Sequence, residues 1–176
     1  HPIPVQRGFD AHYGMLGGGG SYFNPPYMIE DDTIIHEGGG DYYLTDAISE
    51  RAVAMVQDAA RRAAPFFLYV AYTAPHWPLH AWPEDIERYR GIYREGGWDG
   101  VRTSRHEELN GMGVLDPKWD ISPRDEAAPP WDDVEEKEWQ DLRMAVYAAQ
   151  VDRMDQGIGR ILAKLRELGL EDDTLV

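Results

Sequence analysis

The 176-residue sequence contains no cysteine. This absence excludes disulfides, thiolate metal ligands and a cysteine nucleophile within the chain. No apolar run approaches the ~18 residues that a membrane-spanning helix requires. Positive charge is also scarce, because 17 Lys and Arg against 32 Asp and Glu give a formal net charge of −15. Nucleic acids and anionic membranes bind basic surfaces, so neither is expected as a partner.

The chain is long enough for one domain with a sizeable core. Its 18 glycines and 12 prolines indicate many connecting segments between helices and strands. The sequence begins with His1 rather than methionine, and nothing in it specifies a compartment or an oligomeric state.

Residues 1–44 are predicted to be irregular, since aromatic residues alternate there with turn formers. Glycines at 17–20 can take positive φ or let another backbone pass closely. The acidic and glycine-rich stretch 30–43 is predicted to be a surface excursion or a short hairpin.

A helix is predicted to follow, with Thr45 as its N-cap and Pro65 as its stop. Asp46 in the first turn, and Arg61 and Arg62 in the last, suit the helix dipole. Its apolar positions recur at helical spacing: Ile48, Ala52, Met55, Val56, Ala59 and Ala63.

The next segment, "FFLYVAY" at 66–72, is apolar at every position. This pattern is typical of a central strand covered by helices on both faces. Residues 45–83 are therefore predicted to form a helix–strand core, and the fold class to be α/β.

Residues 84–133 are polar and interrupted by Gly and Pro, which predicts an irregular insertion with at most a short helix near 84–94. A second long helix is predicted from about 134 or 138 to 168, with Gly169 just past its end. Its apolar stripe comprises Leu142, Val146, Ala149, Met154, Ile158, Ile161, Leu165 and Leu168. "DDTLV" then predicts the start of another buried strand, as if the chain were cut from a longer domain.

The candidate functional residue is His76, in the segment "TAPHWP" directly after the predicted strand. Ligands of open α/β sheets bind at such strand ends. Pro75 and Pro78 restrict the backbone around the imidazole, which could donate a hydrogen bond to an anion or deliver a proton. A purely structural role for His76 is about equally expected. Trp77 is predicted to lie in the core, as is Trp82, although the two could also wall a pocket.

Other polar residues are predicted to have no catalytic role. His80 lies four residues after His76, but the prolines exclude a regular helix and with it the usual zinc-pair geometry, so no metal site is predicted there. Solvated or arginine-paired positions are predicted for Asp152 and Asp155, beside Arg153 and Arg160, and for the acidic run at 30–32. Ser122 lacks the G-x-S-x-G frame of a nucleophile.

Several segments, taken in order, resemble the sulfatases, most closely bacterial arylsulfatases: "RGFDAHYG", "YFNPPY", "YLTDAISERAV", "PFFLYVAYTAPHWPLHAWPEDIERY" and "MAVYAAQVDRMDQGIGRILAKL". The resemblance covers nearly the whole chain. It implies an alkaline-phosphatase-like sandwich with a mostly parallel central sheet flanked by helices.

The resemblance further implies hydrolysis of a small-molecule sulfate ester. Sulfatases use a formylglycine made from the Cys or Ser of a C/S-x-P-x-R motif, and a divalent cation, usually calcium. His76 matches the histidine of the family's "PHxP" segment, so it is expected to contact the sulfate group and to assist the departing oxygen.

The family's C/S-x-P-x-R, G-K-x-H and D-N-G blocks do not occur in the sequence. Residues 1–176 are therefore expected to be a single incomplete segment from the middle of a catalytic domain. The nucleophile and the metal ligands are expected outside the chain, which alone should be inactive. Two alternatives stay open: a phosphonate or phosphate ester hydrolase of the same superfamily, and an inactive fragment or pseudo-sulfatase.

Overall fold

A computed structural model describes residues 3–17, 19–62 and 64–176. The chain divides into two compact units. Unit 1 comprises residues 1–81 and 150–176, and unit 2 comprises residues 82–149. The prediction that all 176 residues belong to one catalytic domain stays a prediction.

Unit 1 begins with a short 3-10 helix, η1 (Pro4–Arg7), followed by a small antiparallel sheet in the order β1-β2-β3. Its strands are β1 (Tyr13–Met15), β2 (Met28–Glu30) and β3 (Thr33–Ile35). Residues 1–44 are thus not wholly irregular. Three-residue strands are too short for a period of two to be visible in the sequence. The hairpin alternative at 30–43 is confirmed for β2 and β3, whose turn places Asp31 at a φ of 55°, a region that Asp tolerates.

Helix α1 (Leu44–Arg62) confirms the first predicted helix. It begins at Leu44, two residues before the start that a Thr45 N-cap implies, so Thr45 lies buried inside the first turn. The buried face of α1 includes Ser49, Ala52 and Val56. Ala63, which was predicted to belong to the apolar stripe, lies outside the described residues.

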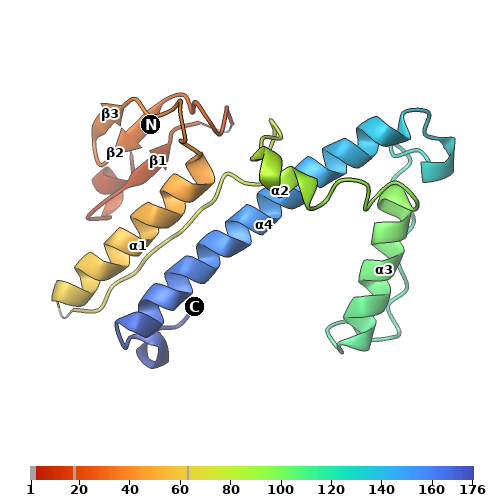
Figure 1. The fold of residues 1–176 in the computed structure, drawn as a ribbon. Helices are drawn as coiled ribbons and strands as arrows, with labels where there is room; N and C mark the ends of the chain where they lie inside the picture. The colour runs from red at the N-terminus through yellow and green to blue at the C-terminus, as the bar shows by residue number, and fades with distance from the viewer. Residues whose placement is uncertain (1–2, 18, 63) are drawn as a thin grey trace. The chain divides into compact units, whose positions relative to one another are not determined.

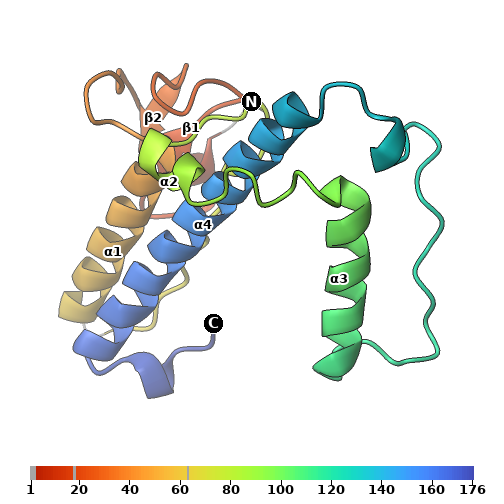
Figure 2. The same ribbon diagram turned by 45° about the vertical axis from the view of Figure 1, so that its right-hand side comes forward.

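Helix α4 (Lys137–Glu167) confirms the second long helix. Gly169 follows it with a φ of 67°, and the Leu170 amide donates to the Leu165 carbonyl at 2.9 Å, as expected for a glycine-terminated helix. From residue 150 onward α4 belongs to unit 1, where it lies beside α1 (Figures 1 and 2). An ion pair of Arg153 with Asp46 at 2.8 Å joins the two helices.

The prediction of a buried central strand at 66–72 is wrong for the structure of this chain. The segment forms no strand, and Phe67 and Tyr69 are 79% and 72% exposed. A strand requires hydrogen-bonded neighbours, and within the described residues none pairs with this segment. Instead it runs along unit 1 in extended form, where the hydroxyls of Tyr72 and Ser49 are 2.8 Å apart.

The predicted strand at the C-terminus is also not formed. Residues 171–173 make a 3-10 helix, η3 (Glu171–Asp173), and Leu175 and Val176 are exposed. As at 66–72, apolar composition alone does not make a strand when the described residues offer no sheet beside it.

Unit 2 contains α2 (Pro83–Glu87), α3 (Gly97–Gly111), the 3-10 helix η2 (Trp131–Asp133) and the first part of α4. The short helix predicted near 84–94 corresponds to α2. The prediction that 84–133 is otherwise irregular is wrong for α3. The sequence did not indicate this helix, because its glycines and scattered polar residues show no helical period. Among the helices of the described residues, none is long and apolar enough to cross a membrane.

Candidate active site

The turn at 73–80 carries the predicted site residue. The His76 amide donates to the Thr73 carbonyl at 3.0 Å, and the flanking Ala74–Pro75 and Trp77–Pro78 peptide bonds are both cis. His76 is exposed at this turn. Its exposure leaves the imidazole accessible to a ligand, which a histidine satisfied within the core would not be.

The His76 ring has a defined tautomer. Its Nδ1 lies 2.8 Å from the Trp77 carbonyl oxygen. A carbonyl oxygen only accepts, so Nδ1 carries the proton and donates. In the neutral ring Nε2 is then unprotonated, and among the described residues it has no hydrogen-bond partner. Nε2 is therefore the nitrogen of His76 that can accept or deliver a proton.

The glycine-rich segment passes directly beside this turn. A Cβ at Gly19 would lie 3.3 Å from the Trp77 carbonyl oxygen and 3.7 Å from Nδ1 of His76. The prediction that glycines here take positive φ or permit close approach is confirmed, at Gly17 with a φ of 116° and at Gly19 by this contact.

A cluster of four aromatic rings supports the turn; we call it the aromatic cluster, and it comprises Tyr22, Phe23, Tyr43 and His80. Tyr22 and Tyr43 are almost completely buried and stack with ring centroids 5.7 Å apart. The Tyr43 hydroxyl donates to the His80 carbonyl at 2.8 Å. His80 thus contributes to packing. The site was predicted without Tyr22 and Tyr43, because their partners lie 37–58 residues away and no local spacing indicates such contacts.

Tyr22 forms hydrogen bonds with two residues of the turn at 73–80, His76 and His80. Its hydroxyl donates to the His76 carbonyl at 2.9 Å, and its amide donates to Nδ1 of His80 at 3.4 Å. Burial raises the pKa of Tyr22 to about 12. The phenol therefore stays protonated, and remains a donor, throughout the neutral range.

The predictions for Trp77 and Trp82 have different outcomes. Trp77 is 58% exposed, so its prediction as a core residue is wrong. It lies next to His76 in sequence and projects from a turn, where the surrounding chain cannot enclose an indole. Trp82 is partly buried and belongs to unit 2.

Two aspartates of the long helices, Asp46 and Asp152, bind neighbouring side chains. Asp46 accepts two hydrogen bonds from Arg153 at 2.8 Å and one from Arg160 at 3.2 Å. Burial raises the pKa of Asp46, but the hydrogen bonds and charges of the two arginines outweigh it, and the pKa lies below its ordinary value. Asp152 accepts from Gln156 within α4, and Asp155 is exposed.

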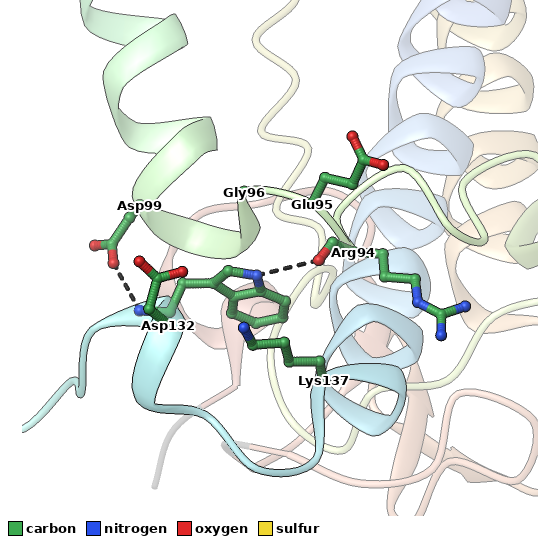
Figure 3. A pocket seen from close by; sticks show the side chains of 7 residues that line it. Arg94, Glu95, Gly96, Asp99, Asp132 and Lys137 are labelled. Carbon is green, nitrogen blue, oxygen red and sulfur yellow. Dashed lines mark hydrogen bonds between the residues drawn. The ribbon is translucent and has the colours of Figure 1, made fainter.

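Unit 2 contains a cavity of about 320 Å³ (Figure 3). Its lining residues are Arg94, Glu95, Gly96, Asp99, Trp131, Asp132 and Lys137. The Trp131 indole donates to the Arg94 carbonyl at 3.1 Å, and its amide donates to Asp99 at 2.8 Å. This amide is the main reason that the pKa of Asp99 lies below its ordinary value, with further lowering by Arg124. The hydrogen bond from the Trp131 amide to Asp99 thus holds η2 against α3.

Comparison with known proteins identifies the family of this chain. A family model described as Sulfatase matches residues 4–176. The chain belongs to the sulfatase family. An uncharacterized sulfatase of Schizosaccharomyces pombe is 31% identical over 98% of the chain, and an arylsulfatase of Klebsiella aerogenes is 30% identical over 98%. The chain spans only 34% and 39% of the lengths of these two sulfatases.

A solved structure supports the fold. The crystal structure of Ps i-CgsB in complex with a neocarrahexaose superposes with a TM-score of 0.60 at 24% identity, covering 96% of this chain and 31% of that protein. The predicted fold class, an α/β chain of the alkaline-phosphatase-like fold, is confirmed. The sheet that the described residues themselves form is the antiparallel β1-β2-β3 sheet.

Proposed function

We propose that the protein to which this chain belongs is a sulfuric ester hydrolase of the arylsulfatase type, and that His76 is one of its catalytic residues. The observation that carries the proposal is the sulfatase match over residues 4–176, which includes the turn around His76. The similarity to an arylsulfatase over almost the whole chain supports the same class of substrate, a small sulfate ester.

His76 would act through Nε2. In the imidazolium form, Nε2–H donates a hydrogen bond to an anionic oxygen of the sulfate group. It can then transfer its proton to the ester oxygen as the alcohol departs. The ring becomes neutral and keeps the proton on Nδ1, which still donates to the Trp77 carbonyl, so the transfer leaves the Nδ1–H tautomer.

The family implies a divalent cation and a formylglycine, and the residues of this chain do not fit either. The sequence contains no C/S-x-P-x-R motif, and no group of three or more His, Asp or Glu side chains in the described part of the chain is placed to hold a metal ion. We therefore propose that residues outside this chain supply both groups. His76 would provide the proton-transfer part of the site.

The test is an assay of the protein encoded by the complete reading frame, with p-nitrophenyl sulfate, p-nitrophenyl phosphate and a phosphonate ester as substrates. Turnover of the sulfate well above the other two is expected. Preference for the phosphorus esters would favour the phosphatase or phosphonatase alternative. Absence of turnover with all three, in a frame that also lacks C/S-x-P-x-R and D-N-G, would indicate a pseudo-sulfatase.

A further inference from the structure

We propose that Tyr22 is a positioning residue for His76: its hydroxyl holds the His76 carbonyl and thereby sets the direction of the imidazole. This inference rests on the proposed function only in assigning catalysis to His76. It adds a residue from the glycine-rich N-terminal segment, 54 positions earlier in the sequence, to the machinery of the site.

The His76 ring depends on backbone geometry for its direction. The side chain is exposed, and its Nδ1 donates to the Trp77 carbonyl, an oxygen of the same turn. The His76 carbonyl belongs to the peptide unit that joins His76 to Trp77. Fixing that carbonyl limits rotation about the ψ angle of His76, so it holds the backbone from which the imidazole projects.

Tyr22 is suited to fix this carbonyl. It is completely buried, so its phenol cannot swing into solvent, and its hydroxyl lies 2.9 Å from the His76 carbonyl oxygen. Because burial raises its pKa to about 12, the hydroxyl stays protonated and donates. Stacking on Tyr43, with ring planes 27° apart, restricts the phenol further. A buried donor held this rigidly restricts the movement of the carbonyl that accepts its hydrogen bond.

A second tyrosine in the aromatic cluster provides a matched comparison. Tyr43 is as buried as Tyr22, and its hydroxyl also donates to a backbone carbonyl of the turn, at 2.8 Å. That carbonyl belongs to His80, four residues beyond the proposed catalytic imidazole. Tyr22→Phe and Tyr43→Phe thus delete the same group from the same cluster, and only the first releases the His76 carbonyl.

The experiment measures kcat and KM of the complete protein with p-nitrophenyl sulfate for Tyr22→Phe, Tyr43→Phe, His76→Ala and the double variant Tyr22→Phe/His76→Ala. Misplacing a catalytic group by a fraction of an ångström should lower kcat by about tenfold in Tyr22→Phe, with KM within about twofold. Tyr43→Phe should keep kcat within about twofold. Because Tyr22 acts through His76, Tyr22→Phe should have no further effect on kcat in the His76→Ala background.

The outcomes separate the two proposals. If Tyr22→Phe leaves kcat within twofold, lowers it equally in the His76→Ala background, or matches Tyr43→Phe, then Tyr22 is a framework residue and this inference is overturned. The proposed function survives that result. If His76→Ala itself leaves kcat unchanged, the proposed role of His76 fails, and the positioning role fails with it. Thermal unfolding of both tyrosine variants should show similar losses of stability, since each removes a buried hydroxyl that donates to a backbone carbonyl.

Discussion

Gly157 of α4 lies against Ser49 of α1 so closely that a methyl group at Gly157 would overlap the serine hydroxyl. The same hydroxyl donates to the Thr45 carbonyl and lies 2.8 Å from the Tyr72 hydroxyl. At this point the two helices and the extended segment after α1 meet. A glycine is required there by the space between the helices.

Replacement of Gly157 tests this packing directly. Gly157→Ala should lower the free energy of unfolding by about 2 kcal/mol, since the added methyl group must push α1 and α4 apart. Gly159→Ala is the matched control in the same helix, because no atom lies within 4 Å of its Cβ position. That variant should be neutral or stabilised by up to about 1 kcal/mol. Thermal unfolding of the complete protein measures both, and equal effects would contradict the close contact.

The Asp46–Arg153 pair predicts a pH-dependent stability. Because the pKa of Asp46 is lowered in the folded protein, its stabilisation is present above the ordinary pKa of an aspartate and is lost as pH falls through the folded value. Asp46→Asn should therefore lower the free energy of unfolding by about 2 kcal/mol at pH 7, and by progressively less below about pH 4. Urea denaturation at several pH values measures this difference.

Asp58→Asn is the control for Asp46→Asn, because Asp58 and its partner Arg61 are both largely exposed. The control should change the unfolding free energy by less than about 1 kcal/mol. A loss in Asp46→Asn that is the same at pH 3 and pH 7 would show that the ion pair is not its cause.

The isolated chain should self-associate through residues 66–72, whose exposed aromatic side chains lie on an extended backbone with no sheet partner in the described residues. Light scattering should therefore rise with concentration. Phe67→Ser should reduce it, whereas Val114→Ser, at an exposed position of unit 2, should not. A monodisperse isolated chain would refute the prediction.

The isolated chain should also fail to hydrolyse p-nitrophenyl sulfate above a heat-killed control.

His76→Ala in the complete protein should lower kcat by ~10²-fold, because general acid assistance to the departing oxygen is lost. His106→Ala is the matched control, since Nε2 of His106 also lies close to a backbone carbonyl, that of Trp119 at 2.9 Å. The control should retain kcat within about twofold. Equal activity of both variants would make His76 a structural residue.

The sequence by itself determined the local and compositional properties of this protein. The helical spacing of apolar residues located α1 and α4, since it recurs along one continuous segment, although Ile158 and Leu168 of the predicted α4 stripe are 37% and 36% exposed. Gly169 marked the end of α4, and the contiguous motifs around His76 indicated the sulfatase family. Each of these signals is contained within a few turns of chain, so no knowledge of distant contacts is needed to read it.

Only the tertiary structure decided which distant residues support His76 and which apolar segments are covered. Tyr22 and Gly19 reach the histidine turn from more than 50 residues away, and the tautomer of His76 follows from one carbonyl oxygen. Residues 66–72 have the composition of a central strand, yet a strand exists only where a neighbour supplies its hydrogen bonds. Apolar sequence specifies a preference for burial, and the arrangement of the rest of the chain determines whether that burial is achieved.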